Sequence, residues 1–330
     1  MMRRAGLRPA LLLGIAFFLT AHAPARAEEF PSRPVTLIVP SAPGGTLDAL
    51  ARLMAQGMAT DLGRNVVVEN VSGAGSVVGT QRLVRSEADG YTIGFGNMGS
   101  MAAAAALGTD PSFDPRRDLA PISLVANVPM VLAVSPTSTV RDLGGLVGRI
   151  RSRGEEVTFG TPGTNTTGHL APAYLLSILG AKAMLVPYRG AGPAMSDLAA
   201  GTVEAVIDQT VTMIPAHLGG TARALAVTGT ARIPQLPDVP TFAEAGVPAF
   251  DMVIWNAIAG PRGLPEARVE RLRVAIEAAL ANPAVAERLA GLAAQVPPPA
   301  ERGPAAMRAR IAADVEHWTK VVGQAGLAPR

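Results

Sequence analysis

Short runs of β-branched and apolar residues alternate with segments of helical periodicity along most of the chain. Residues 35–39 form one such run, and after a Pro-Gly-Gly turn apolar side chains recur at three- and four-residue spacing from Leu47 to Met58. This alternation predicts an α/β fold with largely parallel sheets. The expected strands are residues 35–39, 65–68, 92–96, 131–134, 157–160, 183–186, 205–207 and 224–228.

The pattern changes to helices alone after Pro261. One apolar stripe runs from Val269 to Leu280 and another from Met307 to Val322, with a proline-rich segment between them. The helices expected before this point are residues 46–61, 77–86, 143–152, 168–179 and 193–200.

Two segments are candidates for crossings between two lobes: the apolar residues 122–134 and the proline-rich residues 233–242. Two crossings would return the C-terminal helices to the first lobe and create a hinge. The expected division is residues 28–125 for the first part of lobe 1, residues 126–228 for lobe 2, and residues 229–330 for the return to lobe 1.

The first 27 residues have the features of a secretory signal peptide. Three arginines precede an apolar core at residues 11–21, and alanines at 25 and 27 fit the small-residue cleavage rule. The core is shorter than the about 20 residues that a membrane-spanning helix needs. We therefore expect cleavage after Ala27 and export to the periplasm.

Removal of this segment changes the charge balance. The whole chain has 29 Lys and Arg against 26 Asp and Glu, and loss of the four arginines at 3, 4, 8 and 26 leaves 25 against 26. A nucleic-acid partner is not expected, because such proteins usually present a basic surface. The chain has no cysteine, which excludes disulfides, a thiol nucleophile, a Cys zinc site and a lipidated Cys.

Three loops carry the candidate chemistry, and each joins an expected strand to an expected helix. They are residues 40–45 with Gly44 and Gly45, residues 69–79 with three spaced glycines, and residues 159–171 with four threonines and an asparagine. Thr46 is expected to cap its helix, with Asp48 in the first turn. Free N–H groups at a helix N-terminus bind anions, and ligand sites in α/β folds gather at the carboxyl ends of strands.

The motifs of these loops resemble a known family. PSAPGGTLDALAR, VENVSGAG, ADGYTI, TPGTNTTGHLA, VPYRGAGPAMSDLAAG and RIPQLPDVPTFAEAG occur in the order found in the substrate-binding proteins of tripartite tricarboxylate transporters, also called Bug proteins. The resemblance covers the whole expected mature chain. It implies a type II periplasmic binding-protein fold, in which two α/β lobes close around a small carboxylated solute.

The resemblance also implies roles for individual positions. The first loop would touch the distal end of the solute, with the second loop beside it, and the third loop would hold the proximal carboxylate. Asp208 matches an acidic position that some members place near a ligand amino group. The ligand-binding residues expected on this basis are Ser41, Pro43, Gly44, Gly45, Thr46, Asp48, Gly73, Ala74, Gly75, Ser76, Thr161, Gly163, Thr164, Asn165, Thr166, His169, Tyr188 and Asp208.

Three positions depart from the family pattern. Ser41 stands where members often carry an aromatic residue, Ser76 replaces the second glycine of a GAGG motif, and Asn165 replaces a glycine in the third loop. Specificity therefore cannot be transferred from other members.

Several side chains have two readings. Arg189 pairs with a ligand carboxylate or forms a structural salt bridge, and Asp208 binds an amine or caps a turn. Tyr188 and His169 line a cleft or pack beside it. Trp255 is expected to pack between the domains rather than to stack on a ligand.

The function expected from these features is capture of a mono-, di- or tricarboxylate, or an amino acid, by a monomeric receptor that hands it to the membrane permease subunits. The alternatives are a periplasmic enzyme that acts on a carboxylated metabolite and a sensor that presents its closed form to a membrane kinase. Neither an H-E-x-x-H nor a G-x-S-x-G motif is present, and no lysine follows a glycine loop in Walker fashion. No enzyme activity, metal or cofactor is therefore expected.

Overall fold

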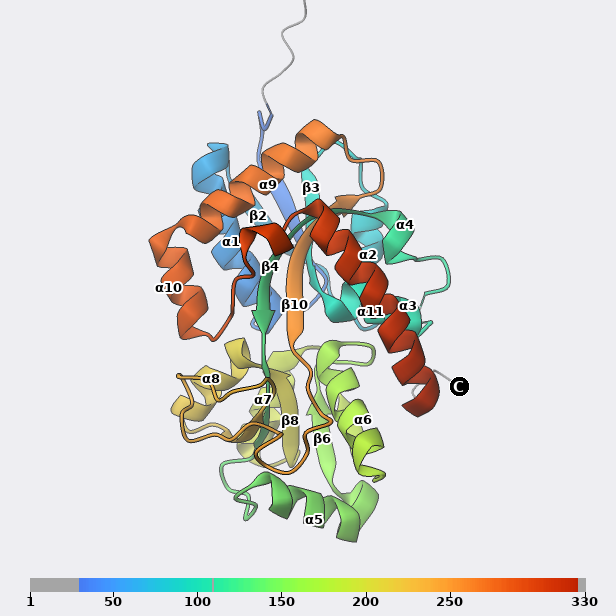
Figure 1. The fold of residues 1–330 in the computed structure, drawn as a ribbon, viewed down its shortest axis with the longest axis vertical. Helices are drawn as coiled ribbons and strands as arrows, with labels where there is room; N and C mark the ends of the chain where they lie inside the picture. The colour runs from blue at the N-terminus through green and yellow to red at the C-terminus, as the bar shows by residue number, and fades with distance from the viewer. Residues whose placement is uncertain (1–29, 109, 326–330) are drawn as a thin grey trace, which may run out of the picture.

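Two five-stranded sheets, one in each lobe, form the framework of the molecule (Figure 1). The computed structural model describes residues 30–108 and 110–325. The expected signal peptide, residues 1–27, lies outside the described residues.

The two sheets repeat one arrangement. In the first, the order is β2-β1-β3-β10-β4, and in the second it is β7-β6-β8-β5-β9. Each has three parallel strands followed by an antiparallel strand that arrives from the other lobe, which is β10 in the first sheet and β5 in the second. The strands are β1 Val35–Val39, β2 Val66–Asn70, β3 Thr92–Asn97, β4 Leu119–Val128, β5 Met130–Val134, β6 Thr158–Thr161, β7 Met184–Pro187, β8 Ala205–Gln209, β9 Arg223–Val227 and β10 Ile254–Pro261.

Helices connect these strands and cover the sheets. In the first lobe, α9 packs against α1, and α11 packs against β4 (Figure 1). The α-helices are α1 Thr46–Leu62, α2 Val77–Val84, α3 Ala104–Ala106, α4 Pro115–Asp118, α5 Leu143–Arg153, α6 Thr167–Leu179, α7 Ala191–Ala200, α8 Thr210–Leu218, α9 Glu266–Ala281, α10 Pro283–Gly291 and α11 Pro304–Ala325, and a π-helix spans Gly99–Ala103.

The type II periplasmic binding-protein architecture expected from the sequence is confirmed, and all eight expected strands are present with small shifts at their ends. The expectation of helices alone after Pro261 is also correct. Strands β4 and β10 and helices α3, α4, α8 and α10 were not predicted from the sequence. All eight residues of β10 are buried, so this strand lacks the alternation of polar and apolar positions that marks a half-exposed strand.

The chain changes sheets at Pro129, between β4 and β5, and returns to the first sheet at Ile254. The prediction of a crossing within residues 122–134 is confirmed, but residues 233–242 are not the second crossing. They pack on the second sheet, where Ile233 and Leu236 contact the core that contains Val131. The lobe limits at 126–228 and 229–330 stay predictions.

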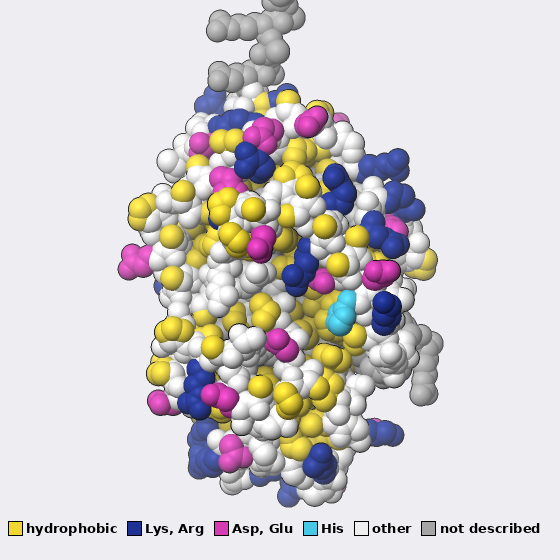
Figure 2. All heavy atoms as spheres, viewed as in Figure 1, with side chains coloured by type: hydrophobic (Ala, Val, Ile, Leu, Met, Phe, Trp, Pro, Cys, Tyr) yellow, Lys and Arg dark blue, Asp and Glu magenta, His cyan; other side chains and the backbone are white. Residues whose placement is uncertain are grey.

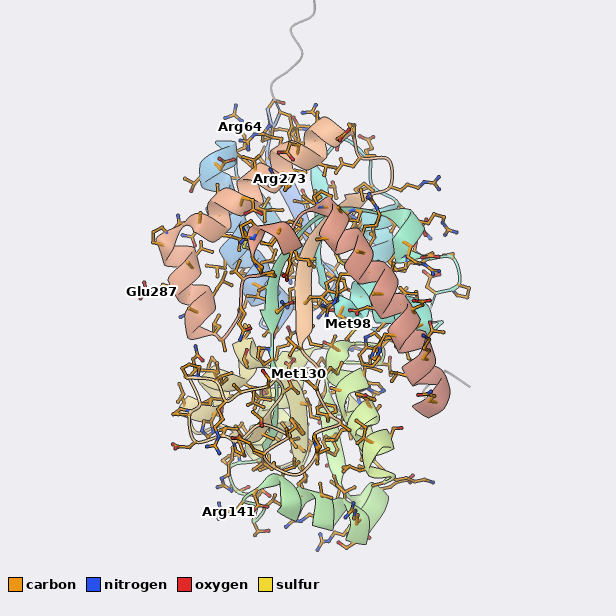
Figure 3. All side chains as sticks on the ribbon, in the orientation of Figure 1. Arg64, Met98, Met130, Arg141, Arg273 and Glu287 are labelled. Carbon is orange, nitrogen blue, oxygen red and sulfur yellow. The ribbon has the colours of Figure 1, made fainter. Side chains whose placement is uncertain are left out.

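A continuous apolar core joins the two lobes. Met98 and Met130, labelled in Figure 3, both belong to it and lie near the junction. Trp255 on β10 is fully buried in the same core, and its indole Nε1 donates a hydrogen bond to Asp314 of α11. Its role is therefore packing, as expected.

Charged side chains of both signs are scattered over one face of the molecule (Figure 2). On the face shown in Figure 2, basic and acidic side chains are interspersed rather than gathered into a stripe. Within residues 30–108 and 110–325, no helix has both the length and the apolar character needed to cross a membrane.

Candidate ligand-binding site

A cleft of about 510 Å³ lies between the two lobes, a volume suited to a small metabolite. Six strand-to-helix junctions line it, three from each lobe. In the first lobe these follow β1, β2 and β3, and in the second they follow β6, β7 and β8. The carboxyl ends of the parallel strands of both sheets therefore face one space, which is where α/β folds bind ligands.

The first junction, residues 40–47, brings Ser41, Gly45 and Thr46 to the cleft. Thr46 is not the N-cap that the sequence analysis expected, because Gly45 occupies that position and Thr46 is the first helical residue. The hydroxyl oxygens of Ser41 and Thr46 are buried without a hydrogen-bond partner among the described residues. Two hydroxyl groups at an uncapped helix start are therefore available to a bound molecule.

Asp48 lies in the first turn of α1, as expected, but it does not line the cleft. Its Oδ2 accepts a hydrogen bond of 3.0 Å from the Gly44 backbone nitrogen. Burial raises the pKa of Asp48, but hydrogen bonds from Arg52 and Gly44 outweigh this effect and hold the pKa below its usual value. Asp48 therefore holds the loop of residues 40–45 in place without lining the cleft itself.

The second junction contains four consecutive residues with positive φ: Gly73 at 146°, Ala74 at 44°, Gly75 at 62° and Ser76 at 78°. All four line the cleft. Residues other than glycine rarely adopt this conformation. Each such residue lowers the free energy of unfolding by about 1 kcal/mol or more. The positive φ at position 76 explains why a glycine is usual there in the GAGG motif. In this chain Ser76 occupies the position and carries the strain.

Replacement of Ser76 by glycine is expected to raise the free energy of unfolding by about 0.5–1 kcal/mol, because glycine adopts positive φ without steric cost. Urea denaturation of the two proteins measures the change. Ser196→Gly is the matched control, since Ser196 lies inside α7 and glycine destabilises a helix interior. Equal destabilisation by both substitutions would contradict the assignment of strain to Ser76.

The third junction, residues 162–168, brings Gly163, Thr164 and Thr166 to the cleft. Thr161 and His169 lie behind this wall and pair with each other, with 3.0 Å between Thr161 Oγ1 and His169 Nδ1. Burial lowers the pKa of His169, so its imidazole is neutral near pH 7. Asn165 does not line the cleft either, and its φ of 68° explains why glycine is usual at this position.

Three further side chains with two readings line the cleft: Tyr188, Arg189 and Asp208. The hydroxyl of Tyr188 donates a hydrogen bond of 2.5 Å to Asp197; burial, together with this carboxylate, raises the pKa of Tyr188 to about 12. Arg189 is exposed and has no ion pair with a described residue. Asp208 is buried, and burial raises its pKa to about 6. Its oxygens accept hydrogen bonds from the Gln209 backbone N–H and the Thr212 hydroxyl, which act in the opposite direction.

Five of the helices that begin at the cleft have no side-chain cap: within the described part of the chain, no side chain caps α1, α2, α6, α7 or α8. At the sixth junction, after β3, Asn97 Oδ1 accepts hydrogen bonds from the first two N–H groups of the π-helix. Away from the cleft, Asp114, Asp142 and Asn282 cap α4, α5 and α10, while α9 begins after Pro265 without a side-chain cap.

Uncapped N-termini carry the positive end of the helix dipole and N–H groups that no side chain satisfies. Backbone carbonyls satisfy some of these groups, since the N–H groups of Val77 and Val78 in α2 and of Thr210 in α8 donate to carbonyl oxygens of preceding or neighbouring loops. Five uncapped N-termini converge on one cleft, which therefore attracts anionic groups.

The two lobes touch around the cleft. A methyl group added to Gly75 would lie 1.7 Å from the carbonyl oxygen of Thr164 in the other lobe. A methyl group on Gly190 would lie 3.0 Å from the Ala42 Cβ. Both contacts need a glycine on one side, so the structure shows the lobes in a closed arrangement.

Twelve of the expected site residues line the cleft and six do not. The six are Pro43, Gly44, Asp48, Thr161, Asn165 and His169, and a role for them in ligand binding stays a prediction. The cleft also contains Asn97, Ser100 and Gln209, which the sequence analysis missed. Asn97 and Gln209 end strands β3 and β8, and Ser100 follows β3, so the rule that strand ends share one edge was a signal for them. Among the described residues, no cluster of acidic, His or Cys side chains could hold a metal ion.

Comparisons with known proteins agree with this geometry. The model of the tripartite tricarboxylate transporter family receptor matches residues 50–327. BugT of Bordetella pertussis is 36% identical over 96% of this chain and 96% of its own length. The structure of MatC from Rhodopseudomonas palustris with bound malate has a TM-score of 0.86 and 33% identity, and covers 89% of this chain and 100% of that one.

A second R. palustris protein, solved with adipate, gives a TM-score of 0.86 at 33% identity, over 92% of this chain and 100% of that one. The match to the family model extends over most of the chain, and the similarity to these relatives is global. The chain therefore belongs to the tripartite tricarboxylate transporter receptor family, also called the Bug family, and is a solute-binding receptor with the type II periplasmic binding-protein fold.

Proposed function

We propose that this receptor captures a small carboxylated metabolite in the periplasm and delivers it, as a monomer, to the membrane permease subunits of a tripartite tricarboxylate transporter. The observation that carries the proposal is the convergence of five uncapped helix N-termini on the cleft. A carboxylate supplies acceptor oxygens for the N–H groups at these N-termini that have no acceptor within the chain. Hydrogen bonds to a charged group contribute about 1.5–3 kcal/mol each.

A dicarboxylate suits the distribution of these helices best. The N-termini of α1 and α2 belong to the first lobe, and those of α6, α7 and α8 belong to the second. A solute with a carboxylate at each end would complete both sets and hold the lobes together. The similar proteins solved with malate and with adipate have ligands of this kind.

A thermal-shift screen tests the proposal. Protein is taken from the periplasm of cells that express the full chain, with Glu28 as the expected first residue, and is unfolded, freed of solute and refolded. A ligand at 100 times its Kd stabilises the folded state by about 2.7 kcal/mol, which corresponds to a rise in Tm of about 4 °C for a chain of this length. We expect such a rise with malate, adipate or a related diacid.

The matched controls are the diamides of the same acids, which keep the length but lose the charge. Equal shifts with diacids and diamides, or no shift with any mono-, di- or tricarboxylate, would contradict the proposal. Recovery of the bound diacid unchanged separates a receptor from the enzyme alternative, since an enzyme would convert it.

A further inference from the structure

Two buried amide side chains connect the sheets next to the cleft. Asn256 lies on β10 of the first sheet and is fully buried, and Gln209 lies at the end of β8 of the second sheet and is 2% exposed. The Asn256 Nδ2 is 3.0 Å from the Gln209 Oε1 and 3.2 Å from the carbonyl oxygen of Ile254. Gln209 lines the cleft, whereas Asn256 does not.

The orientation of both amides follows from the Ile254 carbonyl. A backbone carbonyl only accepts hydrogen bonds, so the Asn256 atom beside it must be the NH₂ group. The same NH₂ group faces Gln209, so the nearer Gln209 atom must be its oxygen. The Gln209 NH₂ group then points away from Asn256, and it has no acceptor among the described residues.

We propose that Gln209 donates its side-chain N–H to an acceptor oxygen of the bound solute, and that Asn256 is a positioning residue that fixes this polarity. The inference rests on the proposed function and adds a specificity determinant to it. A cleft that presents a donor here selects a carboxylate, carbonyl or hydroxyl oxygen and disfavours an ammonium group. The neighbouring Asp208 agrees with this, because its oxygens already accept hydrogen bonds from the Gln209 backbone and from Thr212.

Side-chain amide NMR of the refolded, solute-free protein tests the orientation without any ligand. The Asn256 NH₂ protons, bonded to two acceptors, are expected to exchange slowly with water, and those of Gln209, open to the cleft, are expected to exchange fast. Their signals are assigned by their loss in Asn256→Ala and Gln209→Glu. Slow exchange at Gln209 with fast exchange at Asn256 would overturn the proposal, whether or not any carboxylate binds.

Calorimetric titration with malate and adipate tests the contact with the solute. Gln209→Glu keeps the shape but replaces the donor by a carboxylate, and is expected to weaken binding about 10- to 100-fold. Gln56→Glu, on the exposed face of α1, is the matched control for the added charge and is expected to leave binding unchanged. Equal affinity of Gln209→Glu and the wild type would overturn the contact.

Asn256→Ala leaves Gln209 free to rotate. If the Gln209 side chain then turns its oxygen toward the cleft in about half of the molecules, only the other half can donate a hydrogen bond to the solute. The apparent Kd then rises about two-fold, because it is inversely proportional to the fraction of molecules able to bind. The Gln209 NH₂ exchange in this variant distinguishes loss of orientation from general destabilisation, since an unfolded fraction would affect all amides. If the wild-type protein binds no carboxylate, the proposed function is contradicted. If the wild-type protein binds diacids but Gln209→Glu binds them equally tightly, only this inference is contradicted.

Discussion

Gly75→Ala is expected to weaken solute binding about 100-fold or more. The added methyl group would lie 1.7 Å from the Thr164 carbonyl oxygen, and both atoms are held by backbone, so the lobes must separate to relieve the clash. A receptor that pays about 2.7 kcal/mol to close loses a factor of about 100 in apparent affinity. Calorimetric titration with the best diacid of the screen measures the loss, and small-angle scattering with ligand present should show the open form.

Gly63→Ala is the matched control. Gly63 and Gly75 share a φ of 62°, so alanine introduces the same backbone strain at both positions, but a methyl group on Gly63 would meet nothing within 4 Å. Both variants should lose about 1 kcal/mol or more of unfolding free energy, and only Gly75→Ala should lose affinity. Unchanged affinity in Gly75→Ala would mean that bound solute does not require these loops to meet.

Sequence periodicity predicted the parallel part of each sheet because those strands are short apolar runs bounded by turn residues. The run at 35–39 and the helix that follows it match β1 and α1 closely. β10 was missed because Asn, Ala, Gly and Pro interrupt its apolar run, and its pairing with β3 and β4 joins segments far apart in the chain. Local pattern carries no information about such pairing.

The candidate site was predicted in part for a similar reason. Glycines and threonines after strands mark loops that need positive φ or supply hydroxyl groups, and this signal led to Gly75 and Thr164. This glycine and threonine signal does not mark Gln209, which ends β8 and passes directly into α8 without a loop. The sequence also could not show that Thr161 and His169 turn away from the cleft to pair with each other, because side-chain direction at a strand end depends on the packing behind it.

Asp208 is expected to give the receptor an unusual dependence of stability on pH. Burial raises its pKa to about 6, from 3.8 as the usual value for an aspartate. Between these values the folded protein binds a proton that the unfolded chain does not, so this carboxyl stabilises the fold most at low pH, and the contribution is lost as pH rises toward 6. The change from pH 4 to pH 7 amounts to about 2 kcal/mol. Urea denaturation of the wild type and Asp208→Asn across this range measures it.

The difference between the two proteins isolates Asp208 from other titrating groups. Burial lowers the pKa of His169, so that residue contributes the opposite slope, with stability lost as pH falls below about 6.5. Both proteins share this term, which cancels in the comparison. The stability of the wild type relative to Asp208→Asn should therefore be greatest near pH 4 and should fall by about 2 kcal/mol as pH rises to 7. Parallel profiles would mean that Asp208 is solvated, and a solvated carboxylate beside the cleft would oppose the anionic solute that the uncapped helices attract.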